Sequence, residues 1–303
     1  MNFKKVMEHY SEEMNFEVLW DIMLINNADS SKRTVVKETS KRYWGADPFL
    51  FEHDGKTYLF YERYDRKKKK GLIAYRTVEE DLTYSDPQIA IEENFHMSFP
   101  HIFTYNEEIY IIPETSAVGQ IRLYRALDFP SKWELVKTVL ADFPAVDTIV
   151  FNSNEQGIVL HTSLGDSCKV ENYIIECDNT FNFIKKYKVK DFSERGNRNA
   201  GKIKHRNGKM IRVGQDCSGK VYGKGLVMYE CVHGNNEVET ATISYRDFTM
   251  PDDGYCGIHT YNELDDIRVI DLKYMFKKPW YKKITFLIKK CCNAVKRRLQ
   301  RRK

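Results

Sequence analysis

The stretch ADPFLFEHDGKTYLFYE, residues 46–62, decides the fold. Two runs of aromatic and aliphatic residues flank the turn sequence His53-Asp54-Gly55-Lys56. Asp-Gly between two such runs is typical of a β-hairpin, because glycine accepts the positive φ that a tight turn requires. The stretch therefore predicts two antiparallel strands, at residues 49–51 and 57–61.

The hairpin recurs along the chain. The stretch PHIFTYNEEIYIIPE, residues 100–114, aligns with it without a gap, so that Pro100 matches Pro48 and Glu114 matches Glu62. Fainter copies begin near residues 146, 200 and 259. A period of about 50 residues built on hairpins is typical of a β-propeller, in which each repeat forms one four-stranded sheet. Five copies predict an all-β fold, a five-bladed β-propeller.

The sequence divides into three predicted segments. Residues 1–40 form a lead-in whose stretch 16–24 supplies a ring-closing strand, residues 41–272 form the propeller, and residues 273–303 form a basic amphipathic tail.

No apolar run approaches the roughly 20 residues that span a bilayer. The first 30 residues carry six acids and do not resemble a secretory signal. We therefore expect a cytoplasmic protein, whose seven cysteines, without a C-x-x-C pair, are reduced thiols rather than a metal site.

Positive charge is concentrated in the tail. Residues 277–303 contain twelve of the 48 Lys and Arg residues and no acid, which leaves 36 basic against 43 acidic residues in the rest of the chain. A nucleic-acid groove would need a basic face on the body, so we expect no nucleic-acid partner.

The tail also has an apolar stripe at helical spacing, which predicts a helix lying in the plane of an anionic membrane surface. Each basic residue near such a surface contributes about 1 kcal/mol to binding. We expect the protein at the inner face of the cell membrane; the alternative is a helix that packs its stripe on the propeller. The predicted membrane-binding residues are Trp280, Ile284, Leu287, Lys289, Lys290, Arg297 and Arg298.

Equivalent positions of the repeats predict a site on the propeller axis, because the innermost strand of each blade starts near that axis. Carboxylates at such positions serve as acid and base in glycosidic bond chemistry, and amides and imidazoles hydrogen-bond sugar hydroxyls. The alternative is structural: a turn cap at Asp47, inter-blade ion pairs at Glu62 and Glu114, and core histidines. The candidates are Asp47, Glu114 and Asp147 for catalysis, and Trp44, Glu62, His101, Arg198, Gln215, Asp216 and His259 for substrate binding.

Six short motifs carry a family resemblance: WGADPF (44–49), FPHI (99–102), IPE (112–114), VD (146–147), QD (215–216) and GIHT (257–260). Together they resemble the β-propeller domain that precedes the transferase domain in plant glucosamine inositolphosphorylceramide transferase, and similar domains of bacterial proteins tied to surface-glycan synthesis. The resemblance covers roughly residues 40–272.

More distantly, ADP (46–48) and VD (146–147) resemble the inner-strand acids of five-bladed glycoside hydrolases such as arabinanases and invertases. That resemblance implies Asp47 as base or nucleophile, Asp147 as pKa modulator or orienter, and Glu114 as a candidate acid. The Glu-containing acid motif that those hydrolases carry in a later blade is not visible, and Gln215-Asp216 stands in blade four instead.

These observations favour a carbohydrate-active enzyme, a membrane-associated glycosyltransferase or transferase component in the assembly of cell-surface polysaccharide or glycolipid. Its partners would be a glycan or lipid-linked saccharide and other enzymes of glycan assembly. We expect no bound cofactor or metal, and a nucleotide sugar or lipid-linked sugar as donor, although no nucleotide-binding or D-x-D motif stands out. The alternatives are a glycoside hydrolase using Asp47, Glu114 and Asp147, and a non-catalytic glycan-binding scaffold.

Overall fold

The computed structural model describes residues 15–154, 157–166, 168–189, 195–231, 237–250 and 253–278. The predicted membrane-binding residues, Trp280 to Arg298, lie outside this part. The chain divides into two compact units, one of residues 20–273 and one of residues 1–19 with 274–303. The description below concerns the first unit.

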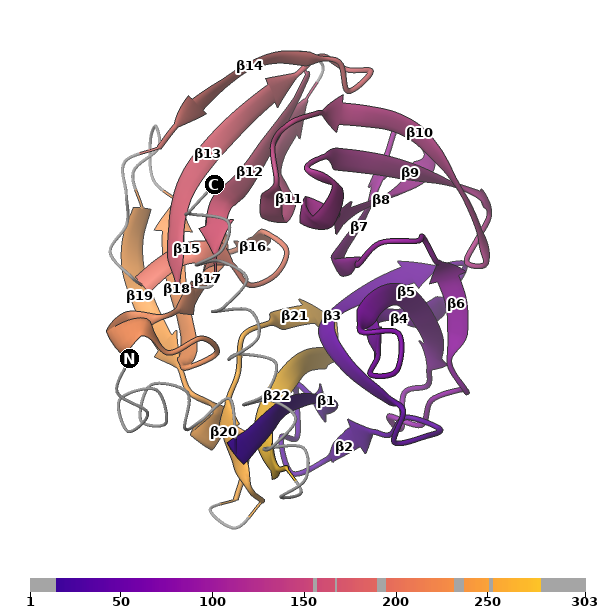
Figure 1. Cartoon of the computed structure of the whole chain (residues 1–303), viewed down its shortest axis with the longest axis vertical. Helices are drawn as coiled ribbons and strands as arrows, with labels where there is room; N and C mark the ends of the chain where they lie inside the picture. Colours follow the sequence, from indigo (N-terminus) through magenta and orange to yellow (C-terminus); the bar gives the residue numbers. More distant parts are fainter. Residues whose placement is uncertain are drawn as a thin grey trace, which may run out of the picture. The chain divides into compact units, whose positions relative to one another are not determined.

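The unit is built from five antiparallel sheets arranged around one centre (Figure 1). Blade one contains β3 (Tyr43–His53), β4 (Lys56–Asp65), β5 (Lys70–Val78) and β6 (Gln88–Ile91). Blade two contains β7 (Ser98–Tyr105), β8 (Glu108–Glu114), β9 (Ile121–Asp128) and β10 (Lys132–Leu140). Blade three contains β11 (Ala145–Asn154), β12 (Gly157–Asp166), β13 (Lys169–Cys177) and β14 (Phe183–Lys188). Blade four contains β15 (Arg195–Asn199), β16 (Lys204–Arg206), β17 (Lys209–Asp216), β18 (Gly225–Cys231) and β19 (Glu237–Ile243).

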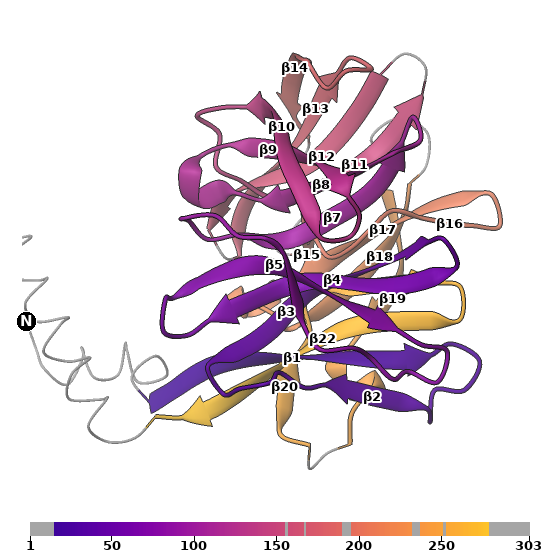
Figure 2. The same ribbon diagram turned by 90° about the vertical axis from the view of Figure 1, so that its right-hand side faces the viewer.

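Blade five joins the two ends of the described chain. Its strands β20 (Tyr255–Gly257) and β21 (Tyr261–Leu264) both pair with β22 (Ile267–Lys277). The next strands outward are β1 (Phe16–Asn26) and β2 (Arg33–Val36), from the N-terminal end of the described residues. In the side view of Figure 2, blade one lies between blade two and these strands of blade five. The all-β, five-bladed propeller predicted from the repeats is confirmed.

The described residues contain three helical segments, each a single 3-10 turn: Ser116–Val118, Ser218–Lys220 and Tyr245–Asp247. Within the described part of the chain, no helix has the length and apolar character needed to cross a membrane.

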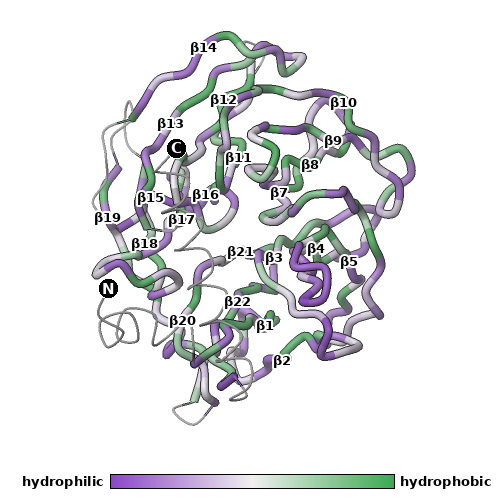
Figure 3. Tube along the Cα trace, in the orientation of Figure 1, coloured by the Kyte–Doolittle hydropathy of each residue, from purple (hydrophilic) through white to green (hydrophobic). Residues whose placement is uncertain are grey.

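Apolar side chains fill the spaces between neighbouring blades. In β3, Phe49 and Phe51 pack with Phe99 and Ile102 of blade two, while Leu50 packs with Ile22 on the other face. This division follows from the strand period of two, because successive side chains point to opposite faces of a sheet. Hydrophobic and hydrophilic residues alternate along much of the trace (Figure 3). Each fully buried aliphatic or aromatic side chain stabilises the fold by about 1.5–3 kcal/mol.

Blades three and four are also joined by buried polar groups. The fully buried Arg212 donates hydrogen bonds to Glu237, to the carbonyl of Gly196 and to Asn199. Asn199 donates in turn to the carbonyls of Asp147 and His161, at 2.8 and 3.1 Å. This network fixes the first strand of blade four against β11, and therefore fixes Arg198 beside Asp147.

The innermost strands of blades one to three share a β-bulge at one position. In blade one the pairing of β3 with β4 passes from Ala46–Glu62 to Phe49–Phe60, so two residues of β3 oppose one of β4. The same shift occurs after Ser98 in blade two and after Val146 in blade three.

The first residue of each bulge has a left-handed backbone. The φ angles are 50° at Asp47, 44° at Phe99 and 50° at Asp147. Aspartate tolerates this conformation better than a bulky residue does, because its short polar side chain can form local hydrogen bonds. Such strained positions cluster at functional sites. The bulges therefore mark Asp47 and Asp147 as candidates for function.

Candidate functional site

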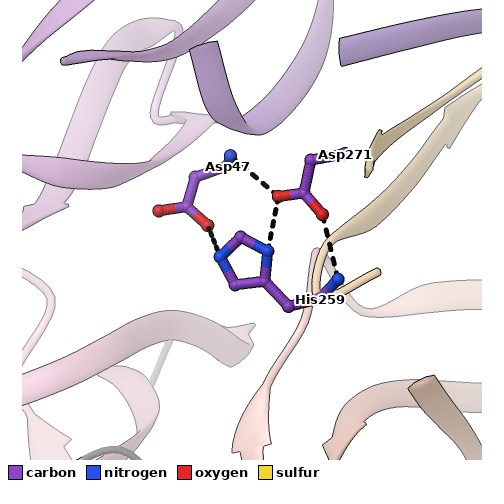
Figure 4. A group of neighbouring side chains, drawn as sticks. All are labelled: Asp47, His259 and Asp271. Atoms are coloured by element: carbon purple, nitrogen blue, oxygen red, sulfur yellow. Dashed lines mark hydrogen bonds and ion pairs between the residues drawn. The ribbon is translucent and has the colours of Figure 1, made fainter. Parts of the chain in front are cut away.

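The first cluster at the axis, here called the histidine group, consists of Asp47, His259 and Asp271. Asp47 comes from the bulge of β3, His259 from the segment between β20 and β21, and Asp271 from β22. Figure 4 shows the imidazole of His259 between the two carboxylates. Its Nδ1 lies 2.8 Å from Oδ2 of Asp271, and its Nε2 lies 3.1 Å from Oδ1 of Asp47. The cluster ties blade one to blade five.

Further hydrogen bonds hold both carboxylates of the histidine group. Asp271 accepts the backbone N–H groups of His259 and Thr260, each at 2.9 Å, and the N–H of Asp47 at 3.1 Å. Asp47 accepts from the Thr260 hydroxyl at 2.9 Å and from the Phe99 N–H at 3.2 Å. The exposed fractions of Asp47, His259 and Asp271 are 5%, 4% and 0%. The group is therefore closed and rigid.

The charges of the histidine group follow from these contacts. Burial alone would lower the pKa of His259, but the carboxylates of Asp271 and Asp47 outweigh it and raise the pKa to about 10. Burial likewise opposes ionisation of Asp47, yet His259 and Thr260 hold its pKa below the ordinary value. At neutral pH the group therefore contains an imidazolium and an ionised Asp47.

The ligand atoms of Asp47, His259 and Asp271 lie within 4.8 Å of one another, as metal ligands would. However, each imidazole nitrogen faces a carboxylate, and Asp271 already accepts three backbone N–H groups. An imidazolium has no free lone pair for a metal ion. The contacts among these three side chains are therefore those of an ion-paired cluster.

The second cluster, here called the arginine group, consists of Glu114, Asp147, Arg198 and Gln215. Arg198 donates from Nε and Nη2 to the two carboxylate oxygens of Asp147, at 2.5 and 3.1 Å, and its Nη2 lies 3.7 Å from Glu114. Gln215 donates to Asp147 at 3.3 Å. Glu114 accepts from the Ser116 hydroxyl at 2.7 Å and from the Asp147 N–H at 3.4 Å. Strands from blades two, three and four thus meet here.

Burial raises the pKa of both carboxyl groups of the arginine group. Burial and the negative charge of Asp147 raise the pKa of Glu114 to about 7, although Arg198 partly opposes this. Burial also raises the pKa of Asp147, and the two-pronged contact with Arg198 offsets much of that effect. A carboxylic acid with a pKa near neutrality can donate a proton at the pH of the cell. Glu114 is therefore the candidate general acid.

Aromatic rings connect the two groups. The ring of Tyr222 lies 5.2 Å from the imidazole of His259, and the guanidinium of Arg198 lies 5.2 Å from the centre of the same ring. Trp20 covers His259 at a centroid distance of 4.0 Å. We call the combined histidine and arginine groups, with these two rings, the hub. The structure thus brings Asp47, Glu114 and Asp147 to one place, as the repeats predict.

Glu62 adds a further carboxyl group beside the hub. Its Oε1 is buried without a hydrogen-bond partner among the described residues, and lies 3.8 Å from Nε2 of His96. Burial, and next the negative charge of Asp47, raises the pKa of Glu62 well above its ordinary value. Glu62 therefore holds its proton more strongly than an exposed glutamic acid does.

Three predicted site residues make their contacts elsewhere. Trp44 stacks on Tyr64 at 4.5 Å, and Asp216 pairs with Arg195 at 3.2 Å. His101 lies two residues beyond the first bulge residue of blade two, and its Nε2 accepts the N–H of Val150 at 3.1 Å. The residue of blade two that corresponds to Asp47 is therefore Phe99, and His101 lies further along the inner strand.

Sequence reasoning missed four residues of the hub and its surroundings: Asp271, Thr260, Trp20 and Tyr222. Asp271 stands in the fifth repeat where Glu62 and Glu114 stand in the first two, so the repeat alignment could have identified it. Trp20 and Tyr222 lie outside the inner strands and belong to no repeated motif.

Two solved structures of similar fold are glycoside hydrolases. The catalytic domain of a family 62 α-L-arabinofuranosidase from Coprinopsis cinerea has a TM-score of 0.59, with 12% identity over 82% of this chain and 84% of that one. A family 117 glycoside hydrolase from Zobellia galactanivorans has a TM-score of 0.54, with 13% identity over 84% of this chain and 90% of that one. At these identities the similarity establishes the fold alone.

Sequence relatives are closer. Glucosamine inositolphosphorylceramide transferase 1 of Arabidopsis thaliana is 36% identical over 189 residues, 60% of this chain and 24% of the plant protein. The protein of the same name from Oryza sativa subsp. indica is 31% identical over 193 residues, 61% of this chain and 26% of its own length. The chain therefore spans about a quarter of the length of these relatives. The N-terminal family of this transferase matches residues 23–249, about three quarters of the 303 residues. The chain belongs to the family described as glucosamine inositolphosphorylceramide transferase 1, N-terminal.

Proposed function

We propose that this protein acts on carbohydrate at the hub, as a glycosyltransferase or as the sugar-handling component of one, in the assembly of cell-surface polysaccharide or glycolipid. The observation that carries the proposal is a pair of carboxyl groups at one place whose pKa values are shifted in opposite directions. Glu114 has a pKa of about 7, whereas the pKa of Asp47 lies below its ordinary value. Glycosyl chemistry uses one carboxylic acid and one carboxylate.

The proposed roles follow from the contacts of each side chain. Glu114 donates its proton to the oxygen of the leaving group, and Asp47 accepts the proton of the attacking hydroxyl. Arg198 holds Asp147 beside Glu114, and the charge of Asp147 keeps Glu114 protonated until the bond breaks. Asp147 and Arg198 are therefore positioning residues, and His259 keeps Asp47 ionised.

The test is turnover with the full-length chain, nucleotide sugars or lipid-linked sugars as donors, and polyprenol-linked saccharides as acceptors. We expect Glu114→Gln to lower the rate of sugar transfer about 10²-fold, because it removes the general acid. The rate of the parent protein should fall as pH rises through about 7, where Glu114 loses its proton. Glu108→Gln, at an exposed position of the same strand, is the control. Absence of both turnover and binding across the panel would refute the proposal.

A glycan-binding component without catalysis is the second candidate. It is favoured by the many hydrogen bonds that already occupy the oxygens of Asp47 and Asp147. In that case Glu114→Gln would weaken sugar binding, measured by calorimetry, while no product formed with the parent protein. Release of free sugar in place of transfer would instead identify a glycoside hydrolase.

We further propose that residues 277–303 hold the protein at an anionic membrane surface on the cytoplasmic side, near lipid-linked substrates and the other enzymes of glycan assembly. Twelve Lys and Arg residues in this segment support the proposal. Changing Lys289, Lys290, Arg297 and Arg298 to serine should weaken binding to vesicles containing phosphatidylserine at least tenfold, in a flotation assay.

The matched control for the vesicle assay changes three exposed lysines of the β4–β5 turn, Lys67, Lys68 and Lys69, to serine. This hydrophilic turn is visible near β4 in Figure 3. Equal loss of vesicle binding in both variants would contradict a specific role of the tail.

A further inference from the structure

The inner strands also line a cavity of about 630 Å³ beyond the hub. All five blades contribute to it, through Leu50 of β3, Ile102 of β7, Val150 of β11, Lys202 before β16 and Leu264 of β21. In β3, Leu50 follows Asp47 by three residues, which is about 10 Å of strand. In β7 and β11 too, the residues that line the cavity come after the bulge in the chain. The cavity is therefore separate from the acid groups of the hub.

Lys202 brings an unbalanced positive charge to this cavity. Its Nζ donates to the carbonyl of Leu50 at 2.8 Å and lies 5.4 Å from the centre of the Phe51 ring. No ion pair joins Lys202 to a carboxylate of the described residues. Burial lowers its pKa to about 7. A half-buried ammonium group with only a carbonyl and a ring as neighbours is well placed to receive an anion.

His101 offers a second donor to the same cavity. The residue is 3% exposed, and burial lowers its pKa well below the ordinary value, so the imidazole is neutral. Because its Nε2 accepts the N–H of Val150, the ring proton is on Nδ1. Nδ1 has no hydrogen-bond partner within the described part of the chain. A buried donor without an acceptor is costly, unless a ligand supplies the acceptor.

The other charged groups near the cavity leave the positive charge of Lys202 unopposed. Glu52 and His205 line it and are exposed to solvent. Lys204 is paired with Glu263 at 3.0 Å. An anion from outside the described residues would pair with Lys202 and accept from His101 at the same time.

We propose that this cavity binds a ligand bearing an oxyanion, a phosphate or carboxylate group, with Lys202 pairing with its charge and His101 donating a hydrogen bond from Nδ1. The volume suits a sugar-sized molecule. The site is independent of the reaction proposed for the hub, since it shares no side chain with the histidine or arginine groups.

The test is isothermal titration calorimetry on the full-length chain with glucose 6-phosphate, glucuronate, inorganic phosphate and glucose. We expect the anions to bind and glucose not to bind. Binding should be accompanied by proton uptake near pH 7, seen by comparing two buffers, because an anion favours the charged form of Lys202. Binding of inorganic phosphate as tightly as glucose 6-phosphate would support the oxyanion site and identify the free anion as sufficient.

Variants test the two donors separately. Lys202→Met should weaken anion binding at least tenfold, His101→Phe should weaken it severalfold, and Lys202→Arg should retain it, which guards against a folding defect. Lys209→Met is the control, because Lys209 is exposed in blade four and pairs with Glu230. Unchanged affinity in Lys202→Met, equal binding of glucose, or no heat with any anion at 10 mM would overturn the proposal.

Discussion

Replacing Arg198 by methionine is expected to lower the free energy of unfolding by about 3–5 kcal/mol, which is the usual cost of breaking a buried ion pair by removing one partner. Methionine keeps much of the side-chain volume but leaves Asp147 without its two-pronged donor. Glu114 lies beside Asp147, so two acidic groups would then share a site without their guanidinium partner. Urea unfolding of the variant and the parent at pH 7.5 measures the difference.

Two further variants separate charge from packing at this position. Adding Asp147→Asn to Arg198→Met removes the uncompensated charge, and should restore a large part of the lost stability. Arg125→Met is the matched control, because Arg125 and its partner Glu134 are both more than one third exposed and surface ion pairs contribute about 1 kcal/mol or less. If the double variant is no more stable than Arg198→Met alone, charge balance is not what holds the arginine group together.

Replacing Asp271 by asparagine should lower the free energy of unfolding by about 3 kcal/mol at neutral pH. The amide oxygen can still accept the backbone N–H groups of His259 and Thr260, so the change removes the charge opposite His259 and the acceptor of the Asp47 N–H. Asp271 is the largest source of the raised pKa of His259, which should therefore fall from about 10.

The Asp271→Asn variant should also change how the free energy of unfolding depends on pH. The folded parent holds the His259 proton up to about pH 10, whereas the unfolded chain releases it near pH 6.5. The stabilising contribution of His259 to the free energy of unfolding is therefore fully present below pH 6.5. It is lost as the pH rises through about 10. In Asp271→Asn the loss should occur at lower pH. Urea unfolding at pH 6, 8 and 10 tests this, and parallel curves for the two proteins would contradict it.

The fold could be predicted from local sequence because each blade starts with a hairpin. Asp54-Gly55 specifies the first turn, and the second copy preserves its length, so the repeat was visible without an alignment of relatives. The strand alternation then assigned the remaining strands of each blade. Fainter copies, such as the one that contains His259, were recognisable only by comparison with the first two.

Residues of the hub could be predicted only where a charged side chain stands at an equivalent position of the repeats. Asp47 and Asp147 satisfy this condition, and both lie on bulges. The gapless alignment of the first two hairpins already matches Phe99 with Asp47, and the shared bulge confirms Phe99, two residues before His101, as that counterpart. The ionised state of each group was not predictable, because it depends on Arg198 and Asp271 reaching across blades.

The pairing of β1 with β22 sets the order in which this protein can mature on the ribosome. β1 ends at Asn26 and its partner β22 begins at Ile267, so about 240 residues must be translated before the two can meet. At 5–20 residues per second this takes roughly 12–50 s. During that time β1 can pair with β2 but not with β22, and Asp47 lacks both His259 and Asp271. The nascent chain thus presents an open strand edge for most of its synthesis, and is a natural client for chaperones that bind hydrophobic segments.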